Sequence, residues 1–114
     1  WGRLPGGEPW VDDLKTGYMA PAVTIPQMLL YALVASKEAG LPTVRASITH
    51  WRRGWEEPER HWLQIGPATL EAFQDDLFAA YRRAIAGPVP RAGSHCRWCP
   101  SAAVCPTVTG CDAV

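Results

Sequence analysis

The stretch Trp10-Val-Asp-Asp-Leu-Lys-Thr-Gly17 joins an apolar segment to two adjacent carboxylates, a lysine and a Thr-Gly pair that ends a strand and turns the chain. Residues two apart in a strand point to the same face, so Asp13 and Lys15 should project together, away from Asp12 and Leu14. A carboxylate beside an ammonium group at a strand end can hold a divalent metal ion and steady the water that the metal activates. Taken alone, so short a motif as Asp-x-Lys favours an exposed strand end with a surface ion pair over a metal site.

The patterns around this stretch predict an α/β fold, a small mixed sheet with flanking helices. Residues 1–8 contain three glycines and a proline, which is typical of a hairpin turn. We expect the strand ending at Lys15 to lie centrally and to pair with the strand at 43–51. The other predicted elements are a helix at 25–39, a strand at 61–65 and an amphipathic helix that begins at Pro67.

The first predicted helix carries a polar pair four residues apart. Gln27 and Tyr31 share one face, so both could reach one object near the end of the first strand. The sequence equally allows Thr24 as N-cap with Gln27 completing a capping box, and Tyr31 as a core residue. Gly40 is the expected C-terminal stop.

Aromatic and guanidinium side chains alternate around the loop between the second and third predicted strands. Such a composition suits stacking on bases and binding of phosphates, with Arg52 and Arg53 as the candidate DNA contacts. Acidic residues in the same loop, Glu56, Glu57 and Glu59, offset that charge. A solvated hairpin whose tryptophans cover the sheet edge is an equal alternative. The aromatic and basic residues concerned are Trp51, Arg52, Arg53, Trp55, Arg60 and Trp62.

All four cysteines, Cys96, Cys99, Cys105 and Cys111, fall in the last nineteen residues, which indicates ligation rather than a disulfide framework. Thiolates at this spacing suit an iron–sulfur cluster (4Fe-4S), with zinc as the alternative. We expect the first three to converge on one point, with Cys111 closing the site or left free. The site would be structural, holding residues 91–114 next to a core of residues 1–90. The histidines have no ligand spacing and are predicted not to bind metal.

Length and composition bound the remaining classes. The chain has 114 residues and zero formal charge, so it forms one small unit, and any basic DNA-binding surface must be local. No apolar run is long enough to cross a bilayer and no secretory leader is recognisable, which predicts a soluble, cytoplasmic protein without a membrane partner.

The order of these motifs resembles the C-terminal part of a PD-(D/E)XK nuclease of the RecB type. The chain is most similar to the iron–sulfur branch that includes the CRISPR adaptation exonucleases, phage RecB-like exonucleases and the AddB nuclease domain. The resemblance implies a DNA exonuclease with a restriction-endonuclease-like core. The catalytic residues would be Asp13 and Lys15, with Gln27 and Tyr31 at the DNA strand being cut. Mg²⁺ or Mn²⁺ would be held by Asp13, the carbonyl of Leu14 and a further acid.

That further acid would lie just upstream of Trp1, as would a first cluster cysteine and the N-terminal part of the core. We therefore expect these residues to be the back part of a longer protein or a chain completed by a partner, and to cut DNA poorly alone. Two alternatives remain open, a catalytically incomplete DNA-binding or assembly module with a structural metal site, and a plain zinc-binding interaction domain.

Overall fold

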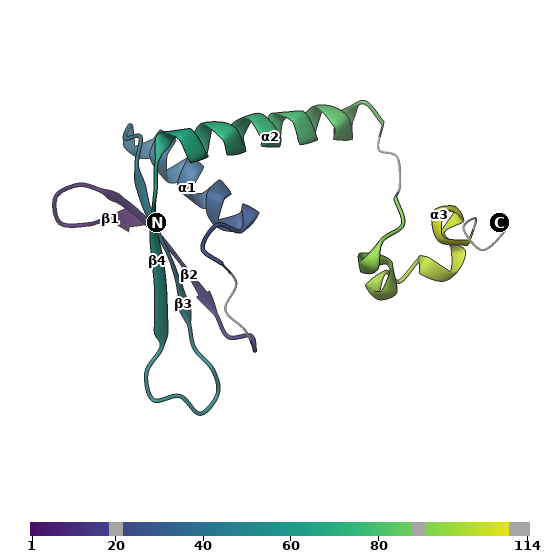
Figure 1. Ribbon diagram of the computed structural model, residues 1–114, viewed down its shortest axis with the longest axis horizontal. Helices are drawn as coiled ribbons and strands as arrows, with labels where there is room; N and C mark the ends of the chain where they lie inside the picture. Colours follow the sequence, from purple (N-terminus) through teal and green to yellow (C-terminus); the bar gives the residue numbers. More distant parts are fainter. Residues whose placement is uncertain (19–21, 88–90, 110–114) are drawn as a thin grey trace. The chain divides into compact units, whose positions relative to one another are not determined.

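The structure is a computed structural model that describes residues 1–18, 22–87 and 91–109. It divides into two compact units, Trp1–Ala79 and Ala80–Val114, with the boundary inside one helix. The elements in chain order are β1 (Gly2–Arg3), β2 (Pro9–Lys15), α1 (Pro26–Ala39), β3 (Val44–His50), β4 (Glu59–Ile65), α2 (Pro67–Ile85), the short 3-10 helices η1 (Ser94–Trp98) and η2 (Ala102–Val104), and α3 (Pro106–Thr109) (Figure 1).

The first unit is built on a four-stranded mixed sheet with the order β1-β2-β3-β4. β2 runs antiparallel to β1 and parallel to β3, whereas β4 returns antiparallel to β3. A parallel pair needs a crossover connection, and α1 supplies it between β2 and β3. The predicted α/β class, the central place of the strand that ends at Lys15 and its pairing with the next strand are therefore confirmed.

The turn between β1 and β2 depends on two glycines with backbone angles that other residues rarely adopt. Gly6 has φ of 98° and Gly7 has φ of 89°. The Leu4 amide donates to the carbonyl of Glu8 at 2.9 Å, and the Gly7 amide donates back to Leu4 at the same distance. The turn therefore fixes the register in which Gly2 faces Trp10.

Helix α1 ends as the sequence predicts but begins differently. Gly40 is left-handed with φ of 67°, and its amide bonds the carbonyl of Lys37. The N-cap is Ile25 without a side-chain cap bond, so the predicted roles of Thr24 and Gln27 as N-cap and capping box are wrong. Pro26 opens the helix, and its fixed φ suits this position. The Gln27 side chain is thereby available for another partner.

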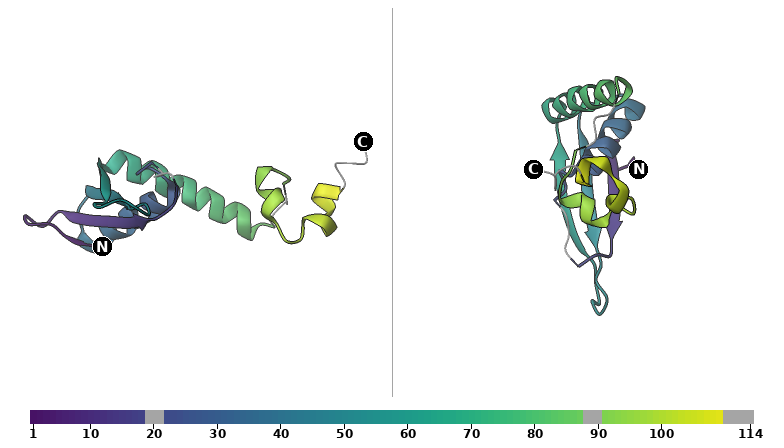
Figure 2. Two further views of the ribbon diagram at one scale, coloured as in Figure 1. Left: turned by 90° about the horizontal axis from the view of Figure 1, so that it is seen from below. Right: turned by 90° about the vertical axis from the view of Figure 1, so that its right-hand side faces the viewer.

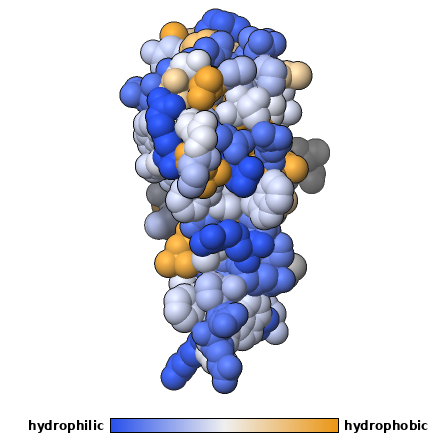
Figure 3. All heavy atoms as spheres, turned by 90° about the vertical axis from the view of Figure 1, so that its left-hand side faces the viewer, coloured by the Kyte–Doolittle hydropathy of each residue, from blue (hydrophilic) through white to orange (hydrophobic). Residues whose placement is uncertain are grey.

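The core lies on one face of the sheet, where α1 and the first turns of α2 cover it (Figure 2). Leu70 of α2 is 4% exposed and Phe73 packs beside it, but further along the apolar stripe Ile85 is 66% exposed. The opposite face carries no helix from the described residues of the first unit, and in Figure 3 it is largely hydrophilic with scattered apolar side chains. The buried apolar residues are Val11, Met28, Ala32, Leu33, Ala35, Val44, Ala46, Ile48, Ile65 and Leu70.

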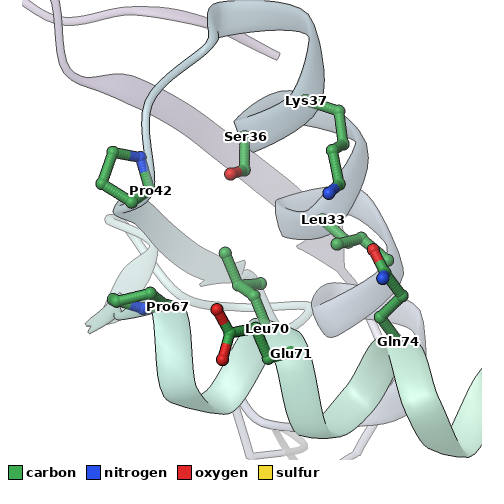
Figure 4. Close-up of a pocket in the computed structure, with 8 residues that line it drawn as sticks. All are labelled: Leu33, Ser36, Lys37, Pro42, Pro67, Leu70, Glu71 and Gln74. Carbon is green, nitrogen blue, oxygen red and sulfur yellow. The ribbon is translucent and has the colours of Figure 1, made fainter.

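A hollow of about 290 Å³ lies between α1 and α2, on the side of α1 that carries Lys37 (Figure 4). Its lining mixes apolar and polar side chains, and none of the predicted site residues contributes to it. They are Leu33, Ser36, Lys37, Pro42, Pro67, Leu70, Glu71 and Gln74. Within the described ranges, no helix is long and apolar enough to cross a membrane.

Candidate active site

The acid and the lysine of the Asp-x-Lys motif meet at the end of β2, as their spacing predicts. Lys15 Nζ lies 2.6 Å from Asp13 Oδ2, and the two side chains are 28% and 19% exposed. Asp13 Oδ2 is itself buried and has no hydrogen-bond partner among the described residues, so the ion pair with Lys15 is its contact with a charged group. A carboxylate oxygen held away from water with a single partner retains lone pairs for a further ligand.

Helix α1 brings the predicted polar pair to the same place. Lys15 Nζ donates to Gln27 Oε1 at 2.9 Å, and Gln27 Nε2 donates to the hydroxyl of Tyr31 at 2.9 Å. The four side chains therefore form one continuous chain, Asp13–Lys15–Gln27–Tyr31, which joins β2 to α1. A hollow of about 240 Å³ opens beside it, lined by Trp1, Val11, Asp12, Tyr31 and Val34.

The chemistry of these groups fixes the direction of each hydrogen bond. An ammonium group only donates, so the oxygen of the Gln27 amide must face Lys15 and its nitrogen must face Tyr31. Lys15 donates one of its three N–H groups to Gln27 and forms an ion pair with Asp13, so at least one N–H remains for another acceptor. The Tyr31 hydroxyl accepts from Gln27, so its own proton can be donated outward, and this side chain is 41% exposed. The arrangement offers two donors for the oxygens of a phosphate or a water molecule.

The neighbouring carboxylate, Asp12, faces the other side of the sheet and has a structural role. Its Oδ1 accepts a hydrogen bond from Ser47 Oγ, and both its oxygens lie 3.0 Å from Thr49 Oγ1. Arg60 Nε and Trp10 Nε1 extend the network to Thr49 and Ser47. Sequence analysis missed the two hydroxyl residues as partners of Asp12, although their alternation with the buried residues of β3 was visible. Of the two adjacent acids, only Asp13 is presented to α1.

The donor set at Asp13 suits one part of a site for Mg²⁺ or Mn²⁺. Hard divalent cations prefer carboxylate and carbonyl oxygens, which the buried Asp13 Oδ2 and the main chain of Leu14 would supply. In the described part of the chain, no three His, Cys, Asp or Glu side chains form a group that could hold a metal ion. A complete site of this kind therefore needs an additional acid.

Basic and aromatic side chains lie directly beyond the ends of β2 and β3. The Trp51 amide donates to the carbonyl of Lys15 at 2.8 Å, which ties the loop after β3 to the site. The guanidinium of Arg52 lies over the rings of Tyr18 and Trp55, while Arg53 is exposed. Tyr18 was not recognised from the sequence, although it follows the strand end by three residues.

The three histidines remain outside any group that could hold a metal in the described residues. The buried ring of His50 places Nε2 2.7 Å from the carbonyl of Gly17, and its edge packs on Trp55. His61 lies 3.5 Å from Glu59 on β4. His50 is therefore a packed residue that holds the segment after β2.

The cysteines of the second unit do not converge as the sequence predicts. Within residues 91–109, Cys96 lies in η1, Cys99 directly follows that helix and Cys105 directly follows η2. No disulfide joins these three cysteines, and they form no group able to hold a metal. Cys96 Sγ instead accepts the Gly93 amide at 3.3 Å. Hydrogen bonds from the backbone of Thr107 and then Val108 lower the pKa of the Cys105 thiol. Backbone donors thus occupy two of the thiols, and Cys111 lies outside the described residues.

The fold and the geometry at the end of β2 define a class, an α/β protein in which an acid, a lysine, an amide and a tyrosine hydroxyl form one linked group at a strand end. A family model described as the PD-(D/E)XK nuclease superfamily matches residues 4–106. The chain therefore belongs to the PD-(D/E)XK nuclease superfamily. Membership indicates a phosphodiesterase that acts on nucleic acid, typically with a divalent metal ion. No curated protein and no solved structure matches the chain significantly.

Proposed function

We propose that the chain carries the active site of a metal-dependent DNA exonuclease of the RecB-like PD-(D/E)XK type, acting in recombination, repair or end processing. The observation that carries this proposal is the side-chain sequence Asp13–Lys15–Gln27–Tyr31, linked by contacts of 2.6, 2.9 and 2.9 Å. It combines an acid, a cation and a polar helix face at one strand end.

In this proposal each residue acts through the group that the geometry leaves available. Asp13 and the Leu14 carbonyl would hold Mg²⁺ or Mn²⁺, which supplies Lewis-acid stabilisation of the phosphate and an activated water. Lys15 uses its remaining N–H to orient that water and offsets the charge that builds on the phosphate oxygens. The Tyr31 hydroxyl donates a hydrogen bond to the DNA backbone. The Gln27 amide holds the side chains of Lys15 and Tyr31 in place. Arg52 and Arg53 bind phosphates beyond the site.

The ligand set at Asp13 is incomplete among the described residues, where no three His, Cys, Asp or Glu side chains form a group that could hold a metal ion. We propose that a further acid, elsewhere in the protein or in a partner, completes it. The lack of a three-ligand group in the described residues otherwise favours a catalytically incomplete DNA-binding or assembly module.

The proposal treats the cysteine segment, residues 91–114, separately from the nuclease core, residues 1–90. Its residue types and spacing support a 4Fe-4S cluster, with zinc as the alternative, whereas the described thiols as placed do not fit either. Iron, sulfide and zinc analysis of anaerobically purified protein distinguishes a 4Fe-4S cluster from a zinc ion. The Cys105→Ser and Cys111→Ser variants test which of these two cysteines is a ligand. No step of the proposed reaction depends on this segment.

Linear and covalently closed circular DNA test the proposed exonuclease. In the whole protein with Mg²⁺, linear DNA should be degraded to short products while closed circles of the same sequence survive, because an exonuclease starts at an end. Closed circles cut as fast as linear DNA would replace the exonuclease with an endonuclease. Absence of metal-dependent cutting of either substrate would favour the binding module.

A further inference from the structure

Three side chains from two separate segments gather beyond the end of β2. The guanidinium carbon of Arg52 lies 4.4 Å from the ring centroid of Tyr18 and 5.6 Å from that of Trp55. Tyr18 follows β2, whereas the other two belong to the loop between β3 and β4. We refer to them as the Tyr18 cluster.

The Tyr18 cluster is continuous with the strand end that carries the catalytic lysine. Lys15 lies opposite His50 in the sheet register. The edge of the His50 ring packs on Trp55, with 5.3 Å between centroids, and His50 Nε2 contacts the carbonyl of Gly17. A short run of contacts therefore leads from the proposed cutting site to the cluster, so one DNA strand could reach both.

The planar guanidinium of Arg52 contacts aromatic rings, while its N–H groups have no partner among the described residues. Its guanidinium lies over two rings, yet it makes no hydrogen bond or ion pair within residues 1–18, 22–87 and 91–109. Five N–H donors lie in the plane of a guanidinium group, where they match phosphate oxygens. Arg45 and Arg60, by contrast, are engaged within the protein, Arg45 with Glu8 and Arg60 with Thr49. Arg52 is therefore preorganised for an external acceptor.

The aromatic members supply open ring surface beside that cation. Tyr18 is 82% exposed and Trp55 is 36% exposed. A base that stacks on such a ring must present its own face, which a base inside a duplex cannot do because its neighbours cover it. Glu56 and Glu57 share the loop and limit its net charge, so stacking has to contribute more than long-range attraction. The cluster thus suits an unpaired nucleotide better than duplex DNA.

We propose that the Tyr18 cluster binds an unpaired nucleotide of the substrate, with the base on the ring of Tyr18 and the phosphate on the edge of Arg52. The enzyme then selects single-stranded or frayed DNA ends. This inference rests on the proposed function, which makes DNA the substrate. Binding of a nucleotide to the Tyr18 cluster can nevertheless be measured without cleavage.

Fluorescence anisotropy with a labelled single-stranded oligonucleotide and its blunt duplex, in EDTA to prevent cutting, tests the cluster. The chain should bind the single strand more tightly than the duplex. Tyr18→Ala should weaken single-strand binding about 5- to 150-fold, the range found for loss of one base–aromatic stack, while Tyr18→Phe keeps it. Arg52→Ala should lower the slope of log affinity against log salt by about 0.7, the value for one phosphate contact on a single strand.

Trp98→Ala is the matched control, because Trp98 is 77% exposed, lies 5.1 Å from the guanidinium of Arg97 and belongs to neither the proposed active site nor the cluster. It should bind like the wild type. Wild-type affinity in Tyr18→Ala, equal loss in Trp98→Ala, no preference for the single strand, or no binding at all would each contradict the proposal that the Tyr18 cluster binds a nucleotide.

The same variants separate this inference from the proposed function. If Tyr18→Ala binds normally while cutting still needs Mg²⁺ and Asp13, the cluster is wrong and the nuclease assignment stands. If Tyr18→Ala loses single-strand binding but no metal-dependent cutting exists, the cluster stands as a nucleic-acid site and the nuclease assignment fails.

Discussion

Removal of Lys15 should destabilise the protein more than removal of Asp13, although the two side chains form one ion pair. Lys15→Ala removes the ion pair from Asp13 Oδ2, which is buried and has no hydrogen-bond donor among the described residues. Asp13→Ala leaves the ammonium of Lys15 with the amide oxygen of Gln27 at 2.9 Å and with solvent. A buried group that loses its only partner is the more expensive defect.

The size of the difference follows from the exposure of the pair. Hydrogen bonds to charged groups contribute about 1.5–3 kcal/mol, and exposed ion pairs contribute about 0–1 kcal/mol. With side chains 28% and 19% exposed, this pair lies between those limits. We expect Lys15→Ala to lower the free energy of unfolding by about 1–2 kcal/mol and Asp13→Ala by less than about 1 kcal/mol.

Urea unfolding followed by circular dichroism at neutral pH and low salt measures both changes. With a slope of about 1 kcal/mol per molar urea, Lys15→Ala should shift the midpoint down by about 1–2 M. The double variant Asp13→Ala/Lys15→Ala is the control and should be more stable than Lys15→Ala alone, because the unpaired carboxylate is gone. A double variant less stable than Lys15→Ala, or a larger loss in Asp13→Ala, would refute the reasoning.

Three further predictions concern the scaffold and the second unit. Ile48→Ala should lower the free energy of unfolding by about 2–5 kcal/mol, because Ile48 is fully buried. Leu14→Ala should change the free energy of unfolding by less than about 0.5 kcal/mol, because Leu14 is 59% exposed. Similar urea midpoints for Ile48→Ala and Leu14→Ala would contradict the burial of Ile48 in the core. Gly40→Ala should lower the free energy of unfolding by about 1–2 kcal/mol, because Gly40 has a φ of 67°. Gly66→Ala is the control and should lower the thermal midpoint less, because Gly66 has no positive φ and open space around it. Because backbone donors lower the pKa of Cys105, its iodoacetamide labelling in metal-free protein should reach half its maximal rate at a lower pH than labelling of a cysteine in an unstructured peptide. A midpoint at or above that of the unstructured peptide, measured by mass spectrometry of the labelled peptide, would show that these backbone donors do not lower the pKa of Cys105.

The sheet was predictable because its signals are local. The period-two pattern and the Thr-Gly stop place β2 at Pro9–Lys15, the same bounds that the structure has. The same alternation placed Asp13 and Lys15 together, and a separation of four residues placed Gln27 and Tyr31 on one helix face. Local geometry was therefore enough to assemble each half of the candidate site.

The features that sequence reasoning missed depend on contacts between distant segments. The sequence left Gln27 open between a helix cap and a partner at the strand end, and Lys15, twelve residues earlier, bonds its side chain. Asp12 finds its hydroxyl partners 35 and 37 residues away, on β3. The cysteine spacing permitted convergence without requiring it, and in the described residues short-range backbone bonds hold two of the thiols instead. Tertiary partners of polar side chains are not encoded in any local period.

The most direct test of the central claim is Mg²⁺-dependent release of labelled nucleotides from linear DNA by the whole protein and its Asp13→Asn variant. This variant keeps the shape of the side chain and removes the charge that binds the metal, and its circular dichroism spectrum should match that of the wild type. The account predicts that the wild type releases nucleotides only with Mg²⁺ or Mn²⁺ and that Asp13→Asn loses this activity. Release by Asp13→Asn at the wild-type rate would contradict the assignment of the active site to the end of β2.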